Sequence, residues 1–206
     1  MSGFYVDASE FDALRAALGA TEEQCKAAYN KAVRQTAAKL ERLARATMIS
    51  GTGVKGRHIV RGRVHVFVSK GKGDKPGGGK IWFGLDSLPV SSLRGKIKPQ
   101  SRRKPKRGSD GRFIKGRGAA GAAGASFTPQ AADIPPLSFP NSFVAKRDGR
   151  RTIWVRNTDG RVNEARVPIY EPMLGQIDSD VFVGAGDMLL DYFSKDLRGR
   201  VAGGVK

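Results

Sequence analysis

Several groups of side chains in this 206-residue chain could in principle support chemistry, and the first is a stretch rich in glycine and lysine, residues 71–80. A phosphate-binding P-loop needs a glycine, four further residues and then Gly-Lys-Ser/Thr, so that backbone N–H groups surround the phosphates. Gly79-Lys80 is preceded by Asp74 where the first glycine would stand and is followed by Ile81 instead of a hydroxyl residue. We therefore predict no nucleotide site and no cofactor.

Metal and catalytic chemistry need clustered ligands or an acid–base pair. His58 and His65 stand seven residues apart, with the single Cys25 distant from both, which is a poor metal-ligand set. A solvated loop position for His58 and a position against a sheet for His65 explain them more simply. Five acids could be arranged as a catalytic set, but helix capping and surface solubility explain acids at these positions: Glu164, Glu171, Asp178, Asp180 and Asp187. We predict no metal site, no catalytic residue and no enzyme.

Dense positive charge is the chemistry that remains. Residues 94–117 hold eleven Lys/Arg and one acid, Asp110, which amounts to +10 of the net charge of +18. Such a segment cannot be buried, because every desolvated ion costs several kcal/mol. Phe113 is its only aromatic residue, so the cluster suits phosphate backbones or acidic protein surfaces better than base stacking. The alternative is a disordered, solvated loop that maintains solubility.

The residues that we expect to contact a partner or DNA come from this basic segment and from a lysine-rich loop upstream of it. They are Arg102, Arg103, Lys104, Lys106, Arg107, Arg112, Lys115, Arg117, Lys70, Lys72 and Lys75.

Length and composition limit the fold. The chain has room for one domain of about 150 residues plus an insertion, so we predict a single domain over residues 1–206 with a basic, Gly/Ala-rich arm at about 94–135. The lone cysteine permits no internal disulfide, the first residues do not resemble a signal peptide, and no stretch approaches the roughly 20 apolar residues of a membrane span. We expect a soluble protein of a reducing cytoplasm.

A long helix is the most extended element that the sequence predicts. A short helix precedes it, with Phe11, Leu14 and Leu18 at helical spacing, after an extended lead-in at Phe4–Val6. Thr21 and Gln24 form a capping box that starts the long helix, Glu22 to Ile49. Its apolar stripe contains Cys25, Ala28, Tyr29, Ala32, Val33, Leu40, Leu43, Ala44 and Met48.

This helix is roughly 40 Å long at about 1.5 Å per residue, which is too long for a small domain to cover. We therefore expect part of the stripe to pack on another subunit as well as on the core. The residues assigned to oligomer packing are Tyr29, Val33, Leu40 and Leu43.

Strand patterns follow a basic loop that is punctuated by glycine. Residues 64–68 alternate with period two, residues 81–83 form their partner, and the flexible tip between them is a candidate contact element. A second hairpin is predicted at residues 143–145 and 153–155 around Asp148-Gly149, with residues 167–170 as an extended edge. Together these strands suggest one small antiparallel sheet.

The C-terminal helix is predicted from Ser179 to Arg198, capped by Asp178 or Ser179 and weakened by Gly184 and Gly186. The expected fold class is α+β: a long N-terminal helix and a C-terminal helix packed on a small antiparallel sheet, with a basic loop insertion.

Three motifs occur in this order along the chain: Trp82-x-Gly84-Leu85 followed by Pro89, Pro140-x-x-Phe143 before a glycine-turned hairpin, and Pro168-Ile169 before the C-terminal helix. With the long cationic helix, this order resembles the minor tail protein Z family of tailed phages and prophages over roughly Ala27 to Leu197. The Gly/Ala run at residues 118–124 and the extended lysine-rich tip depart from the family pattern.

The resemblance implies a structural virion protein that completes the head-proximal end of the tail and makes it competent for head–tail joining. It also implies a homo-oligomeric, six-fold ring in the neck of the virion, assembled in the host cytoplasm. The expected partners are other copies of the chain, the tail terminator or tube protein, the head–tail connector proteins and, as an open alternative, the end of the phage DNA.

Two other functions compete with this reading. A nonspecific nucleic-acid-binding protein of ribosomal or nucleoid type explains a pI near 10.5 and a basic extension, but not the paired hairpins that bracket an insertion. An enzyme such as a nuclease lacks clustered ligands or a base.

Overall fold

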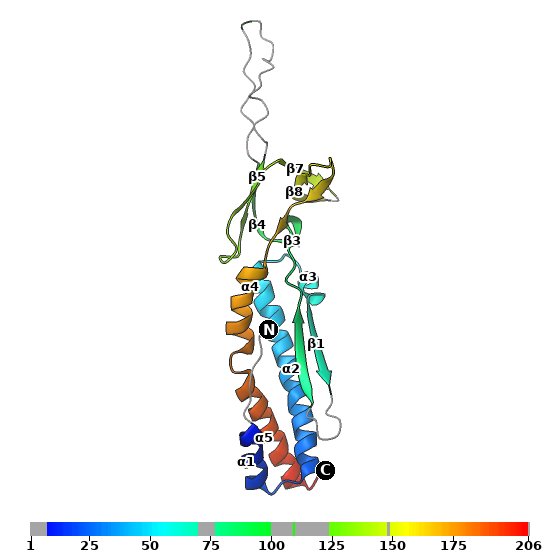
Figure 1. The fold of residues 1–206 in the computed structure, drawn as a ribbon, viewed down its shortest axis with the longest axis vertical. Helices are drawn as coiled ribbons and strands as arrows, with labels where there is room; N and C mark the ends of the chain where they lie inside the picture. Colours follow the sequence, from blue (N-terminus) through cyan, green and yellow to red (C-terminus); the bar gives the residue numbers. More distant parts are fainter. Residues whose placement is uncertain (1–7, 70–76, 100–108, 110–123, 148, 206) are drawn as a thin grey trace. The chain divides into compact units, whose positions relative to one another are not determined.

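The computed structural model of the chain describes residues 8–69, 77–99, 109, 124–147 and 149–205 (Figure 1). The chain forms two compact units. The helical unit comprises Met1–Ile49, Arg57–Leu85 and Met173–Lys206, and the β unit comprises Ser50–Gly56 and Asp86–Pro172. The lead-in predicted at Phe4–Val6 lies outside the described residues.

The predicted fold class is confirmed, because a long N-terminal helix and a C-terminal helix occur together with small antiparallel sheets. The helices are α1 (Ala8–Leu18), α2 (Glu22–Thr52), α3 (Arg57–Arg61), α4 (Tyr170–Gln176) and α5 (Ala185–Gly203), with a 3₁₀ turn η1 (Val90–Ser92) and a π-helical segment η2 (Ile177–Phe182). The loop predicted at these residues is wrong, because Arg57–Arg61 form the short helix α3. His58 therefore lies in a helix and not in a loop.

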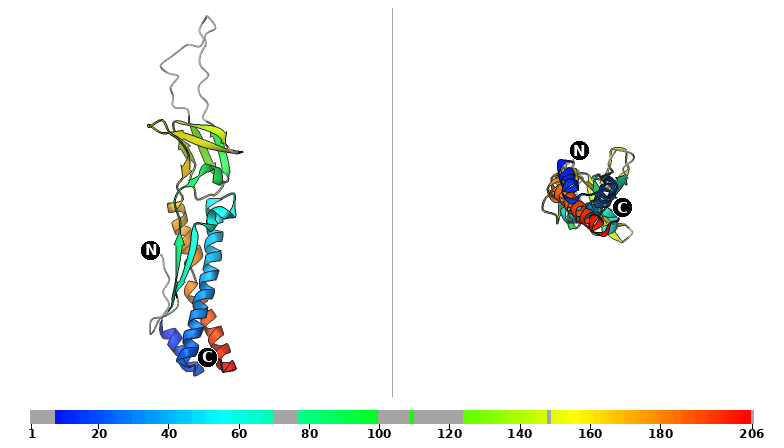
Figure 2. Two further views of the ribbon diagram at one scale, coloured as in Figure 1. Left: turned by 90° about the vertical axis from the view of Figure 1, so that its right-hand side faces the viewer. Right: turned by 90° about the horizontal axis from the view of Figure 1, so that it is seen from below.

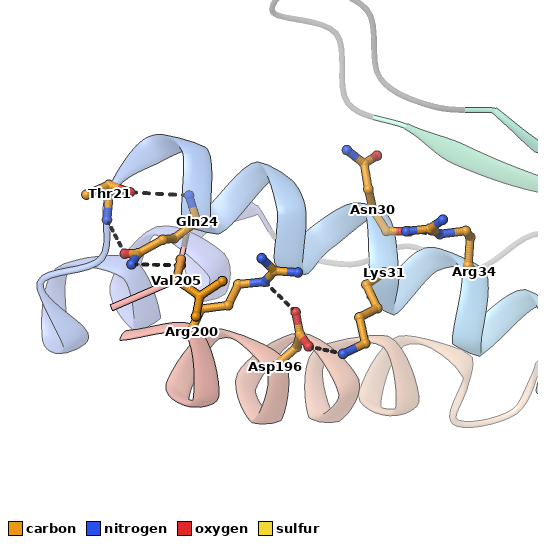
Figure 3. A network of polar contacts seen from close by, with 8 residues as sticks. All are labelled: Thr21, Gln24, Asn30, Lys31, Arg34, Asp196, Arg200 and Val205. Atoms are coloured by element: carbon orange, nitrogen blue, oxygen red, sulfur yellow. Dashed lines mark hydrogen bonds and ion pairs between the residues drawn. The ribbon is translucent and has the colours of Figure 1, made fainter. Parts of the chain in front are cut away.

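Helix α2 begins at the predicted capping box. The Thr21 N–H donates to Gln24 Oε1 at 3.0 Å, and the Gln24 N–H donates to Thr21 Oγ1 at 3.3 Å. This reciprocal pair satisfies two donors that the first helical turn leaves without partners. The side chain of Gln24 also donates to the carbonyl of Val205 at 3.2 Å, so the same residue links the start of α2 to the end of the chain (Figure 3).

One hydrophobic core of the helical unit lies between the helices α1, α2 and α5. Buried side chains of α2 meet those of α5, and Phe11 of α1 contacts both, with ring centroids 5.6 Å from Tyr29 and 4.8 Å from Phe193. Figure 2 shows α1, the beginning of α2 and α5 gathered side by side. The predicted apolar stripe of α2 is thus confirmed as a core face.

A hairpin of β1 (Val64–Ser69) and β2 (Gly78–Phe83) runs alongside α2 (Figures 1 and 2). Its antiparallel pairing, with Val64 opposite Phe83 and Val66 opposite Ile81, confirms the predicted hairpin. The Tyr29 hydroxyl donates to the carbonyl of Gly77 at 3.3 Å and ties the hairpin to α2.

The C-terminal helix begins earlier than predicted and is interrupted. Helical structure already starts at Tyr170, with Pro172 in the first turn, where a missing N–H has no cost, and residues 167–170 are therefore not an extended edge beyond Val167. The predicted cap at Asp178 or Ser179 is wrong, because both residues lie within η2. The true break is at Gly184, whose φ of +69° suits glycine.

The β unit is built from short strands, β3 (Leu88–Pro89), β4 (Gly95–Pro99), β5 (Ala125–Pro129), β6 (Leu137–Phe139), β7 (Ser142–Arg147), β8 (Arg150–Arg156), β9 (Val162–Glu164) and β10 (Arg166–Val167). They form sheets in the orders β10-β3, β4-β5-β6 and β7-β8-β9. The single predicted sheet is wrong, because the β1–β2 hairpin pairs with none of these strands. A period-two pattern identifies a strand but not its partner.

The second predicted hairpin is confirmed in β7 and β8, which pair from Ser142 opposite Val155 to Arg147 opposite Arg150. Gly149 of its predicted turn has a φ of +78°, and Asp148 lies outside the described residues. The ends of the predicted basic arm are ordered strands, since β4 pairs with β5 and places Ile97 opposite the buried Phe127.

Candidate interaction surfaces

The sequence-predicted contact residues all lie outside the described part of the chain. They are Arg102, Arg103, Lys104, Lys106, Arg107, Arg112, Lys115 and Arg117 in the arm, and Lys70, Lys72 and Lys75 at the hairpin tip. Their role as contacts therefore stays a prediction.

The four residues assigned to oligomer packing all lie on α2. Val33 and Leu40 are buried within the chain, at 7% and 3% exposure, while Tyr29 and Leu43 are half-buried. Val33 and Tyr29 belong to the core between α1, α2 and α5. An intersubunit role for this stripe stays a prediction, and the large exposed apolar side chains of the described residues lie elsewhere.

The outer face of the β1–β2 hairpin is one exposed surface. Residues directly opposite in an antiparallel pair share a face, so the register places His65 with Trp82 and Phe67 with Lys80 on the same side. Phe67 is 60% exposed and Trp82 is 49% exposed. The rings of His65 and Trp82 lie 5.4 Å apart. We call this the hairpin face, and two large exposed aromatics on one face of a hairpin are typical of a protein-contact surface.

The position of Trp82 explains the glycine two residues later in the Trp-x-Gly motif. A Cβ on Gly84 would lie 2.8 Å from Cη2 of Trp82, closer than real contacts allow. Arg63 holds the chain in place directly after β2, because its Nη1 donates to the carbonyl of Gly84 at 2.9 Å. The motif thus folds the indole ring over its own backbone and keeps it on the surface.

Positive charge surrounds the hairpin face. The described residues 57–69 and 77–84 include four cations and no Asp or Glu: Arg57, Arg61, Arg63 and Lys80. Lys80 stands directly across from Phe67, and its side chain is exposed, as is that of Arg61.

A second exposed surface has the opposite charge. Residues 167–194 contain five acids and not one Lys or Arg, in a chain with 37 cations. In the helical unit this segment exposes Asp178, Asp180, Asp187 and Asp191, beside Val183 at 72% exposure. We call it the acidic face. Among the described residues, no cation forms an ion pair with Asp178, Asp180 or Asp187, whereas Asp191 pairs with Lys195 at 2.7 Å.

A charged cluster at the other end of α5 joins that helix to α2. Asp196 accepts hydrogen bonds from Lys31 of α2 and from Arg200, the latter at 2.7 Å (Figure 3). Burial by itself would raise the pKa of Asp196, but the hydrogen bonds from Lys31 and Arg200 outweigh it, and the net pKa of this carboxyl is lowered. Asp196 could not be predicted from the sequence, because helical spacing does not show which acid forms an ion pair with a cation on another helix.

Burial also affects two groups in the α1–α2 region. It raises the pKa of the Cys25 thiol, with nearby Arg15 acting in the opposite direction, and it raises the pKa of the Tyr29 hydroxyl. Both groups therefore stay neutral near pH 7, which makes Cys25 a weak nucleophile.

The β unit has a third surface, which is cationic. Its chain segments contain 19 Lys/Arg against 7 Asp/Glu, a net +12. The exposed cations of its strands are Lys96 and Lys98 on β4, Lys146 and Arg147 on β7, Arg150, Arg151 and Arg156 on β8, and Arg166 on β10. The hairpin register places Lys146 opposite Arg151 and Arg147 opposite Arg150. Like charges directly opposite one another destabilise a hairpin, and a bound polyanion would relieve that repulsion.

Glu164, one of the acids considered for catalysis, has a structural role in the β unit. Its Oε1 accepts hydrogen bonds from the Ser91 N–H at 2.8 Å and from the Thr152 hydroxyl at 2.6 Å. Thr152 is buried, at 2% exposure. The carboxylate therefore joins the turn η1 to β8.

The candidate metal ligands do not gather. Within the described ranges, no three His, Cys, Asp or Glu side chains are close enough to hold a metal ion. His65 is exposed on the hairpin face, where its Nε2 lies 3.1 Å from the carbonyl of Gly62. In the same part of the chain, no helix has both the length and the apolar character needed to cross a bilayer.

No protein-family model, no curated protein and no solved structure matches this chain.

Proposed function

We propose that the chain is a structural protein of a tailed-phage particle, which completes the head-proximal end of the tail and makes it competent for head–tail joining. In this role the protein acts as a homo-oligomeric ring, without turnover, in the neck of the virion. Its partners are other copies of the chain, the tail terminator or tube protein and the connector proteins. The resemblance to the minor tail protein Z family supports the proposal.

One structural observation carries the proposal: the helical unit exposes two unlike faces, one basic and aromatic, the other acidic and apolar. A subunit that joins identical neighbours in a closed ring needs two different surfaces that complement each other. The cationic surface of the β unit then remains available for acidic walls of the tail or connector, or for the DNA end.

The decisive experiment is electron microscopy of particles from the producing phage after deletion of the gene. Full heads beside separate tails of normal length would support completion and joining, and a plasmid copy of the gene should restore joined particles. Intact joined particles in the deletion strain would contradict the proposal.

The arm can be tested separately. Replacing Arg102, Arg103, Lys104, Lys106 and Arg107 by glutamine should weaken joining, and raising the salt concentration should weaken joining of the unmodified protein in the same direction if electrostatics carry the contact. Joining that responds to neither charge nor salt would remove this role from the arm.

A second function, nonspecific nucleic-acid binding, is favoured by the net +12 of the β unit. It requires tight binding to duplex DNA or RNA with a steep dependence on salt, because counterions are released from the phosphates. Weak binding at about 150 mM salt would exclude it as the main function.

A further inference from the structure

The two faces of the helical unit are complementary in charge and in apolar character. The hairpin face combines Trp82 and Phe67 with surrounding cations, and the acidic face combines Val183 with exposed carboxylates. We propose that they bind each other between copies of the chain: the hairpin face of one subunit docks on the acidic face of the next. This inference rests on the proposed ring and names the surfaces that would form it.

Geometry within the helical unit permits such head-to-tail contact. Figure 1 shows the β1–β2 hairpin lying along α2. The inner side of the hairpin is already used, because Phe83 of β2 contacts Phe182 of η2 with ring centroids 6.3 Å apart. The outer side, which carries Phe67 and Trp82, is therefore the one left for a neighbour.

The charge distribution indicates that the partner bound at these two faces is a second copy of the chain. The chain has a net charge of +18, so two copies repel each other at most orientations. Residues 173–194 of the helical unit, which contain four acids and no Lys or Arg, offer an attractive surface to the cations around the hairpin face. Like-charge contacts suppress the wrong orientations and opposite charges select the right one.

Because the contact joins two different faces, it is heterologous, and a heterologous contact closes into a ring when its rotation allows. Because the two surfaces differ, charge reversal can distinguish this contact from a contact between two identical faces. Reversing the charge of either face alone should block self-association, and reversing both should restore it.

The test uses the full chain and two double variants of exposed residues. The first, Asp180→Lys with Asp187→Lys, makes the acidic face basic. The second, Arg61→Glu with Lys80→Glu, makes the surroundings of the hairpin face acidic. Lys39→Glu with Arg42→Glu, two exposed cations of α2 that belong to neither face, is the matched control for charge change, and circular dichroism checks that each variant is folded.

Analytical ultracentrifugation of each protein measures the outcome. We expect each reversed variant alone to associate about 100-fold more weakly than the unmodified chain, because like charges then meet at the contact. An equal mixture of the two variants should assemble again, since each face of one finds its complement on the other. A chain with all four substitutions should also assemble, and the control should behave as the unmodified chain.

Three results would overturn the inference: an unmodified chain that stays monomeric at high concentration, reversed variants that assemble normally, or a mixture that does not recover. Assembly that appears only after another phage protein is added would assign these faces to that protein instead. Failure of the proposed function is distinguishable, because joined particles in the deletion strain would contradict it whatever the centrifuge shows.

Discussion

The helical unit and the β unit use charge differently. The helical unit balances 18 Lys/Arg with 12 Asp/Glu, a net +6, whereas the β unit has 19 against 7, a net +12. Among the described residues, the helical unit also contains the two most exposed large apolar side chains, Val183 at 72% and Phe67 at 60%. Mixed charge with apolar surface is suited to contacts between protein subunits, and one-signed charge is suited to a polyanion or an acidic wall. One chain thus separates two kinds of contact into two units.

The sharpest test of this comparison is whether the two units unfold separately. Phe193 of α5 and Phe127 of β5 are both buried, at 2% and 1% exposure, and replacing either by alanine should cost about 3–5 kcal/mol. We expect Phe193→Ala to speed amide hydrogen exchange in α1, α2 and α5 while sparing β4 and β5, and Phe127→Ala to do the reverse. If either variant accelerates hydrogen exchange equally in both units, the two units unfold as a single cooperative structure, which would contradict the comparison.

The next prediction concerns charge. Replacing Lys96, Lys98, Arg150 and Arg151 of the β unit by glutamine should reduce the salt dependence of duplex DNA binding by about 3 to 4 in log–log slope, since each phosphate contact contributes about 0.9. Four exposed cations of the helical unit form the matched control: Lys39, Arg42, Arg57 and Arg198. Filter binding over a range of salt concentrations measures the slope. If both sets lower it equally, the cationic contact does not belong to the β unit.

Comparison of the two units also shows what the sequence could predict. In the helical unit the signals are local: Thr21 and Gln24 stand three residues apart and form the capping box, and the stripe of α2 follows helical spacing. In the β unit the pairing of β4 with β5 crosses the basic arm, and β4 offers only Ile97 as an apolar signal. The alternation of side chains along a strand does not show which distant strand it pairs with, so the pairing of β4 with β5 cannot be predicted from the sequence pattern.

The same limit applies to the surfaces. The sequence identified the cations of the arm, because a charge run is visible in one dimension. It did not identify the hairpin face, whose aromatic pair comes from two strands and depends on the register of His65 with Trp82. The acidic face is visible in the sequence, because residues 167–194 lack Lys and Arg altogether, although helix capping and surface solubility explain each of these acids singly.

The Asp196 cluster provides a smaller, pH-dependent effect within the helical unit. Asp196→Asn should lower the free energy of unfolding at pH 7 by about 1 kcal/mol, because a charge-assisted bond is lost and the Lys31 side chain is half exposed to solvent. Since the pKa of Asp196 is lowered in the folded state, its stabilisation is full above the ordinary value of 3.8 and is lost as the pH falls through the folded pKa.

Urea unfolding of both proteins at pH 7 and near pH 2.5 checks the sign. The difference between them should shrink in acid, and a difference that grows in acid would contradict the lowered pKa. Asp191→Asn is the control, because its pair with Lys195 is exposed on both sides and such pairs contribute between 0 and about 1 kcal/mol.

A further effect of similar size concerns the break between η2 and α5, which lies within the acidic face. Gly184 has a φ of +69° with no atom within 4 Å of an added Cβ, whereas Gly199, inside α5, has equally open space and no positive φ. Gly184→Ala should therefore destabilise the helical unit by about 1 kcal/mol through backbone strain alone, and Gly199→Ala should stabilise it by a similar amount through lower chain entropy. Thermal unfolding of the two variants measures opposite shifts of the midpoint. If both raise it, the chain can run through residue 184 as one continuous helix, and the acidic face would lose the break that sets its shape.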